Sequence, residues 1–143
     1  TAFGALSSAQ ITVLTTAQVE QITTAQLSSM KTGQMAGFTS AQIDALTSTQ
    51  VAALGSSQAA GMTTAQIVAI STDQAGVITA KQAAALDATN ISKLETADLV
   101  KLSTVAVAAL TTAVVDGLST TQVAALTTDQ VNALKATQVA ALA

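Results

Sequence analysis

The chain has 143 residues, enough for one domain of ordinary size. Half of its residues are apolar, only 9% are charged and the formal net charge is −3, whereas about a quarter of the residues of a soluble domain are usually charged. The chain has no Cys, His or Arg, so it lacks the usual ligands of zinc and iron sites, the commonest general base and the cation clusters that bind nucleic acid. We therefore expect no enzyme activity, no catalytic, metal or cofactor-binding residues and no nucleic-acid partner. The apolar runs are also too short for a membrane span.

A large apolar residue recurs every eight residues, without insertion or deletion. These anchor residues are Leu6, Leu14, Ile22, Met30, Phe38, Leu46, Leu54, Met62, Ile70, Ile78, Leu86, Leu94, Leu102, Leu110, Leu118, Leu126, Leu134 and Leu142. The fifth residue after each anchor is apolar too, from Ile11 to Val139, and the residue before it is Gln in thirteen of seventeen octads. We predict a single repeat array over residues 1–143, of about 17 octads in a frame that starts at Leu6. Because the chain opens with Thr1 and not Met, we expect a processed chain or a segment of a longer repeat protein or filament.

Each octad carries the signature of a helix start. Thr15 and Gln18 have the S/T-x-x-Q spacing of a capping box, in which the Thr hydroxyl accepts from the N3 amide and the Gln side chain returns to the N-cap amide. Leu14 then precedes the N-cap and Val19 is the fourth helical residue, and these are the two positions that a hydrophobic staple joins. Ten of the seventeen octads carry the full box. The pattern predicts a helix of about five or six residues in every octad.

A helix this short is unstable alone, because nucleation costs more than so few hydrogen bonds return. It persists only where neighbouring units bury their Leu and Val faces together. We therefore predict an all-α fold, a solenoid or superhelix of very short helices with one helix per octad. Small residues at the sixth and seventh positions after each anchor, such as Ala52 and Ala53, would let the chain turn and the backbones approach closely.

Two other folds compete with this prediction. In one long helix the apolar stripe would drift by about 80° per octad, which no packing partner could follow. A β-solenoid stays open as an alternative, because Thr, Val and Ile favour strands. Against it, inward residues of a strand have even spacing, while the anchor and the following Val are five residues apart. The Gly, Asn and Pro that its turns would need are also scarce.

The octads between Leu86 and Val115 depart from the consensus. Asn90, Asp98, Ala106 and Val114 replace the Gln, and Asp87 and Glu95 replace the capping Thr or Ser. Lys93 and Lys101 add further charge to this stretch. We interpret it as neutral drift in a tolerant repeat, with a contact patch or joint as the alternative.

The remaining candidate residues do not form a site. Glu20, Asp44, Asp73 and Asp129 are scattered acids that we expect to be solvated, and Lys81 and Lys135 are expected to be surface charges. The many Thr residues have no base to activate them. Stacked Thr pairs could form a flat hydroxyl array of the ice-binding kind, but capping already accounts for the first Thr of each pair.

The strings LTTAQV at Leu14–Val19 and LTTDQV at Leu126–Val131 resemble the tandem LTTxQ octads of large secreted or surface-attached, often adhesin-like, bacterial proteins. The similarity covers Leu6 to Leu142. The strings also share L-T-x-x-Q with periplasmic LTxxQ chaperones, where it occurs once or twice at the start of a charged long helix. This chain lacks that charge, so the chaperone activity is not carried over.

The adhesin-like resemblance implies an extracellular or cell-surface location and a structural role as a stalk, fibre or filament subunit. We also expect self-association, because neither end carries a charged capping segment and the low charge gives little repulsion. The alternative is a solenoid binding module that adheres to a peptide, glycan or surface. A surface poor in aromatic residues and Arg offers few binding hot spots, which favours the structural role, and no small-molecule substrate is evident.

Overall fold

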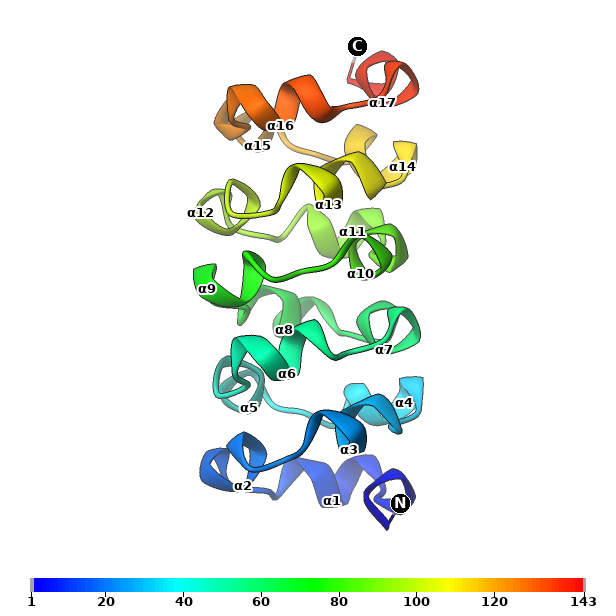
Figure 1. Ribbon diagram of the computed structural model, residues 1–143, viewed down its shortest axis with the longest axis vertical. Helices are drawn as coiled ribbons and strands as arrows, with labels where there is room; N and C mark the ends of the chain where they lie inside the picture. Colours follow the sequence, from blue (N-terminus) through cyan, green and yellow to red (C-terminus); the bar gives the residue numbers. More distant parts are fainter. Residues whose placement is uncertain (1, 143) are drawn as a thin grey trace.

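The computed structural model describes residues 2–142 and forms a rod of short helices with its termini at opposite ends (Figure 1). A 3-10 helix, η1 (Ala2–Ala5), precedes one α-helix in each octad. These helices are α1 (Ser8–Thr12), α2 (Thr16–Glu20), α3 (Thr24–Ser28), α4 (Thr32–Met35), α5 (Ser40–Asp44), α6 (Ser48–Ala52), α7 (Ser56–Ala60), α8 (Thr64–Val68), α9 (Thr72–Ala75), α10 (Ala80–Ala85), α11 (Ala88–Ile91), α12 (Thr96–Leu99), α13 (Thr104–Ala109), α14 (Thr112–Asp116), α15 (Thr120–Ala125), α16 (Thr128–Ala133) and α17 (Ala136–Ala141). No strand occurs between residues 2 and 142, so the all-α prediction is confirmed and the β-solenoid alternative is wrong.

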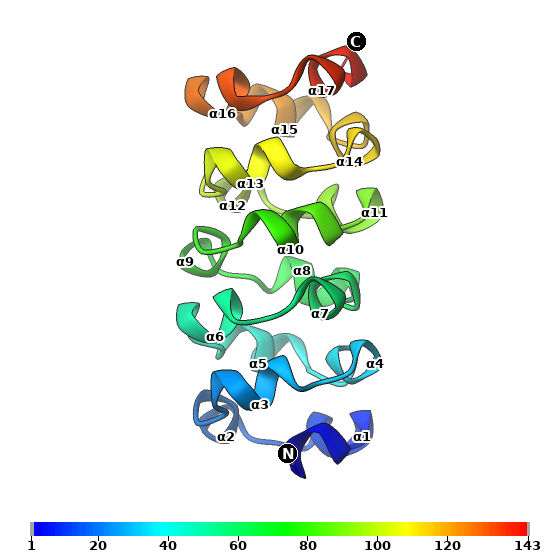
Figure 2. The same ribbon diagram turned by 45° about the vertical axis from the view of Figure 1, so that its right-hand side comes forward.

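Each helix packs against the helix three octads further along the chain, so one turn of the solenoid contains three octads. Three columns result, with α1, α4, α7, α10, α13 and α16 in the first and α2, α5, α8, α11, α14 and α17 in the second. The third column contains η1, α3, α6, α9, α12 and α15. The view in Figure 2, turned by 45°, shows the same layers stacked along the rod.

The capping box that the sequence predicts, or its Gln half, starts α1–α10 and α15–α17, whereas α11–α14 begin in the same register without it. In α6, Gln50 N donates to Thr47 Oγ1 at 3.2 Å and Thr47 N donates to Gln50 Oε1 at 2.8 Å. Where the N-cap residue has no hydroxyl, as at Lys31, the Gln half of the box remains and Lys31 N donates to Gln34 Oε1 at 2.6 Å. Where the box is present, it fixes the start of the helix locally within the octad.

The chain leaves each helix without any special backbone conformation. Leu86, for example, follows α10 with φ −70° and ψ 145°, and no described residue has a positive φ.

Two glycines are needed because neighbouring turns approach them closely, and not because of their backbone angles. A Cβ on Gly37 or Gly61 would lie 2.6 Å from the carbonyl oxygen of Ser8 or Thr32 in the turn below. The expected close approach of backbones is confirmed at these two seventh positions.

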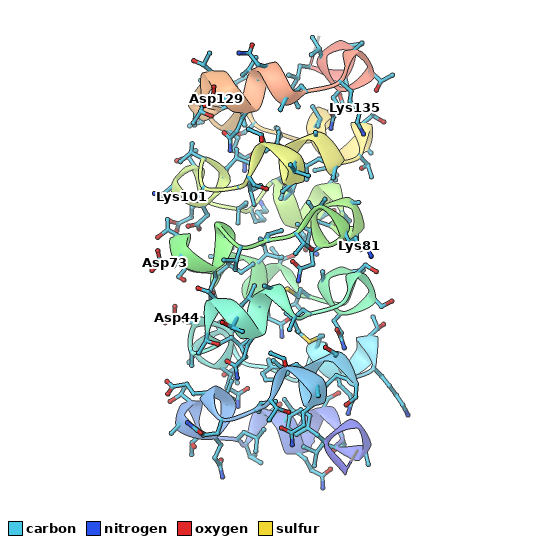
Figure 3. The ribbon with its side chains drawn as sticks, viewed as in Figure 1. Asp44, Asp73, Lys81, Lys101, Asp129 and Lys135 are labelled. Atoms are coloured by element: carbon cyan, nitrogen blue, oxygen red, sulfur yellow. The ribbon has the colours of Figure 1, made fainter. Side chains whose placement is uncertain are left out.

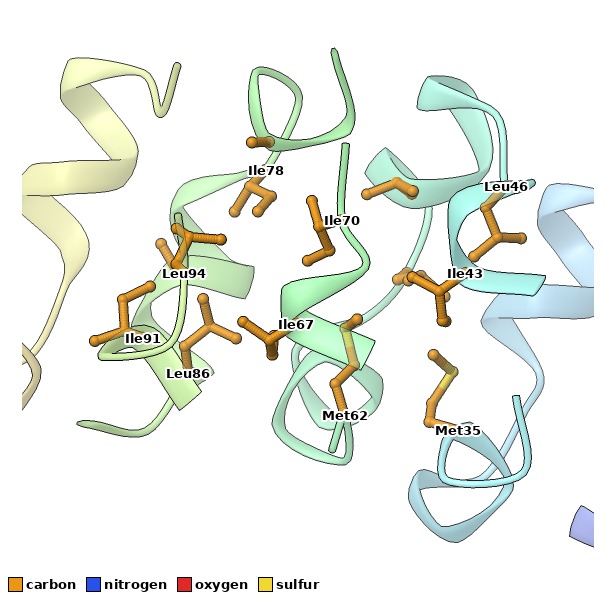
Figure 4. Packing of buried hydrophobic residues seen from close by; sticks show 14 of the residues in the cluster. Met35, Ile43, Leu46, Met62, Ile67, Ile70, Ile78, Leu86, Ile91 and Leu94 are labelled. Carbon is orange, nitrogen blue, oxygen red and sulfur yellow. The ribbon is translucent and has the colours of Figure 1, made fainter. Parts of the chain in front are cut away.

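The core runs along the rod as one cluster made mainly of the anchors and the residues five positions after them, joined by Ala106 and Val114 from the Gln position. Figure 4 shows its middle, where Ile43, Ile67 and Ile91 come from helices and Leu46, Ile70 and Leu94 come from the segments that follow them. Anchors from Ile22 to Leu110 are buried, while Leu6 and Leu14 at one end and Leu118, Leu126, Leu134 and Leu142 at the other are half-buried. Within residues 2–142, the core is therefore closed along the sides of the rod.

Candidate functional site

The charged residues do not gather into a site. Asp44, Asp73, Lys81, Lys101, Asp129 and Lys135 are exposed and lie along the outside of the rod (Figure 3). Among residues 2–142, no three His, Cys, Asp or Glu side chains lie close enough together to hold a metal ion. No helix in the same part of the chain has the length and apolar character needed to cross a membrane.

The distinctive feature of the structure is a second role for the consensus Gln. Gln74 accepts from Ser71 N at 3.0 Å through Oε1, which closes the capping box of α9. Its Nε2 points into the turn below and donates to the carbonyl oxygens of Ile43 at 2.8 Å and Leu46 at 2.6 Å. One planar amide thus starts its own helix and joins that helix to the preceding turn.

We call the residues with this double role the inter-turn glutamines. Each donates to the carbonyl oxygen 28 residues earlier in the chain, which belongs to an anchor, and its side chain is only 1–6% exposed. They are Gln34, Gln42, Gln50, Gln58, Gln66, Gln74, Gln82, Gln122, Gln130 and Gln138. A buried amide of this kind stabilises the fold only while both of its ends are bonded.

The stretch that departs from the consensus interrupts this arrangement for one whole turn. Asp98 in α12, Ala106 in α13 and Val114 in α14 stand where the Gln would be, and none of them brings an amide donor. Asn90, one octad earlier, has a shorter side chain and still reaches the carbonyl oxygen of Met62 at 3.0 Å. We call α12–α14 the amide-free turn. It is a specific structural difference within the stretch interpreted above as neutral drift or a joint.

Asp98 is the one titratable group that this turn buries. Its side chain is 5% exposed, and it occupies the position from which a Gln would donate to a backbone carbonyl. Burial, and secondarily the negative charge of Glu95, raise the pKa of Asp98 above its ordinary value of 3.8. A protonated carboxyl can donate a hydrogen bond as an amide does, whereas a carboxylate cannot.

A small apolar cavity of about 20 Å³ lies in the core between α5 and α10. Ala59 lines it together with Leu54 and Met62, while the equivalent positions on either side of Ala59 are Val51 and Ile67. The cavity is lined almost entirely by apolar side chains and has little more room than one water molecule needs. It is a packing defect left by a small residue at a core position.

The first three glutamines of the array have no partner turn within the described residues. Gln10 and Gln18 are exposed and Gln26 is half-buried, and their Oε1 atoms make the local bonds of the capping box. In the last turn of the described residues, Val131 and Val139 are 46% and 50% exposed, whereas Ile11 and Val19 in the same octad position are fully buried.

These contacts define the molecule as a helical solenoid with three octads per turn, joined internally by side-chain amides. The chain belongs to the ALTTAQ repeat family, whose sequence model matches residues 19–56, 27–64, 91–128 and 115–143. The predicted tandem LTTxQ-type octads are thereby confirmed. No curated protein and no solved structure matches the chain.

Sequence reasoning found the capping role of the Gln and missed its role between turns. A signal for the second role was present. The capping box accepts Glu as readily as Gln, yet this position holds Gln in thirteen octads and Glu in none. The absence of Glu indicates that the position needs a donor as well as an acceptor.

Proposed function

We propose that the protein is an extended structural element, a stalk, fibre or filament subunit, and that it acts at a bacterial cell surface. The observation that carries the proposal is the unbroken rod, with its termini at opposite ends and one core that runs along its length (Figure 1). In such a solenoid each turn contacts only its neighbours, so added repeats add length and leave the cross-section unchanged. This is the geometry that a spacer needs.

The outer surface supports a structural role over the alternative of a binding module. Of the two aromatic residues, Phe38 is buried and Phe3 is half-buried, and the chain has no Trp, Tyr or Arg. Those residue types supply most binding hot spots. We also propose that the protein is not an enzyme, and the support is the lack of His and Cys together with the scattered acids.

The rod shape is tested by small-angle X-ray scattering at low protein concentration. Six layers of helices at about 10 Å each give a maximum dimension of about 60 Å for the monomer. A compact globule of this length would have a radius of gyration of about 14.5 Å, and the rod should exceed it clearly. A monomer at or below the globular value would contradict the proposal.

The surface location is tested by labelling. Antibodies raised against the rod should bind intact cells of the producing organism without permeabilisation. Binding only after permeabilisation would contradict the cell-surface part of the proposal and leave the structural part standing.

A further inference from the structure

We infer that the amide-free turn is a joint built into the rod, and that the interface between α9–α11 and α12–α14 opens more readily than the interfaces on either side of it. The inference goes beyond the proposed function, because it concerns how the rod yields and does not depend on where the protein acts. It is carried by three successive octads whose departures from the consensus all fall on one interface.

The interfaces on either side of the joint are joined by side-chain amides. Three amides join α9–α11 to the turn before it, and three join α15–α17 to α12–α14; they belong to Gln74, Gln82, Asn90, Gln122, Gln130 and Gln138. At the interface between these two, Asp98, Ala106 and Val114 bring no amide. Because one turn contains three octads, three successive losses remove every amide from a single interface.

The missing amides leave three backbone carbonyls without a donor. Each anchor from Leu6 to Leu110 has a carbonyl oxygen that accepts from a side-chain amide of the following turn, except for Ile70, Ile78 and Leu86. The carbonyl oxygens of these three accept no hydrogen bond from the part of the chain that the structure describes. All three residues are buried. An unbonded polar group in such surroundings is unfavourable, and opening the interface to water relieves it.

Apolar packing keeps this joint closed. Ala106 and Val114 are 0% and 1% exposed and belong to the core cluster, so the core continues through the joint. No hydrogen bond among residues 2–142 crosses the interface between α9–α11 and α12–α14. Asp98 cannot replace the missing donor while it is ionised, because a carboxylate only accepts hydrogen bonds. Opening therefore exposes apolar surface but breaks none of the amide bonds that hold the neighbouring turns.

Opening of the joint should loosen α12 first. The stability of a solenoid is approximately a sum of terms for each repeat and for each interface between neighbours, so a weak interface divides the array into two parts. When the parts separate, α12 loses its contact with α9. A helix of four residues does not persist without such contacts. The chain on both sides of α12 then becomes accessible to a protease.

The test is limited trypsin digestion of the folded chain. The chain has no Arg, so its trypsin sites are Lys31, Lys81, Lys93, Lys101 and Lys135. Lys93 and Lys101 lie on either side of α12, whereas a cut at Lys135 reports only on the last octad. Cleavage of a transiently opened segment follows the population of the open form. Lys93 and Lys101 should therefore be cut at least about tenfold faster than Lys31 and Lys81.

A control lysine separates opening of the joint from local accessibility. Ala53 follows α6 as Lys101 follows α12, in the same octad position and the same column. The Ala53→Lys variant therefore places a trypsin site at the equivalent point of a turn whose amides are complete. The introduced lysine should be cut no faster than Lys31 or Lys81.

A variant with restored amides tests the cause. Asp98→Gln combined with Ala106→Gln and Val114→Gln supplies the three donors, and cleavage at Lys93 and Lys101 should slow at least about tenfold while cleavage at Lys31 is unchanged. If the two fully buried positions do not accept Gln and the triple variant fails to fold, Asp98→Gln alone should slow cleavage at least about threefold. Far-ultraviolet circular dichroism checks that each variant keeps its helices.

Two results would overturn the inference. In the first, wild-type Lys93 and Lys101 are cut no faster than the lysine introduced at position 53. In the second, the folded variants with restored amides are cut there at the wild-type rate. Neither result affects the rod shape that scattering tests, so failure of the joint and failure of the proposed function are distinguishable.

Discussion

The side-chain amide of Gln82 donates to the carbonyl oxygen of Leu54 at 2.8 Å, across one full turn of the solenoid. It also donates to the carbonyl oxygen of Val51 at 2.7 Å, and its Oε1 accepts from Thr79 N at 2.8 Å. Three backbone groups from two turns therefore depend on one buried side chain.

Replacing this amide with a carboxylate should destabilise the fold. Gln82→Glu keeps the capping acceptor but buries a negative oxygen against two carbonyls, and we expect a loss of about 2–4 kcal/mol at neutral pH. The matched control is Gln18→Glu, in which the amide is exposed at the end of the rod and the loss should stay below about 0.5 kcal/mol. Urea denaturation measures both. Equal losses at the two positions would mean that the inter-turn bond contributes nothing.

Restoring the amide in the amide-free turn should stabilise it. Asp98→Gln supplies a donor at the position from which neighbouring glutamines reach carbonyls 28 and 31 residues earlier, which here belong to Ile70 and Ile67. We expect a gain of about 1–3 kcal/mol at pH 7, because a buried carboxylate is removed and a hydrogen bond is added. Asp73→Gln, on the exposed side of α9, is the control and should change stability by less than about 0.5 kcal/mol. A destabilised Asp98→Gln protein would show that the turn has repacked around the shorter side chain.

The raised pKa of Asp98 predicts a stability that increases on mild acidification. The folded state holds the Asp98 proton more tightly than the unfolded state, in which the pKa is near the ordinary 3.8. The contribution of this group is therefore fully present below about 3.8 and is lost as the pH rises from there through the folded-state pKa. Urea denaturation between pH 4 and pH 7 should show the trend, and Asp98→Asn should flatten it. A wild-type protein that loses stability on acidification in this window, in parallel with Asp98→Asn, would contradict the assignment.

Filling the small cavity should stabilise the core. Ala59→Val adds two methyl groups toward a cavity of about 20 Å³ whose other walls include Leu54 and Met62. We expect a gain of about 0.5–1.5 kcal/mol in the free energy of unfolding. Ala60→Val, at an exposed neighbour, should give no gain, because Val is a poorer helix former than Ala. Thermal denaturation distinguishes the two, and a clear loss at Ala59 would indicate overpacking.

Truncating an anchor tests the register of the whole array. Leu46→Ala removes a side chain that is 3% exposed and should cost about 2–4 kcal/mol through the cavity that it leaves. Thr49→Ala, three residues later on the outside of α6, should cost less than about 0.5 kcal/mol. Similar losses in chemical denaturation would mean that the anchors do not form the core.

The sequence by itself determined where each helix begins and which residues enter the core. Thr47, Gln50 and the apolar pair Leu46 and Val51 lie within six consecutive residues, so the capping box and the staple depend on local geometry alone. Periodicity could therefore predict the octad helix and its approximate length before any fold was known.

Only the tertiary structure decided how many octads complete a turn and where the Gln amide goes. The angle between successive helices depends on the backbone angles of linking residues such as Leu86, and no Pro or positive-φ Gly in the described residues marks those angles in the sequence. The bond from Gln50 to the carbonyl of Ile22, at 2.7 Å, joins residues 28 positions apart and exists only because three octads close one turn. The hydrogen bonds of the capping box join residues that are neighbours in the sequence. A hydrogen bond between turns depends instead on the backbone angles of all the residues in the three octads that lie between its donor and its acceptor.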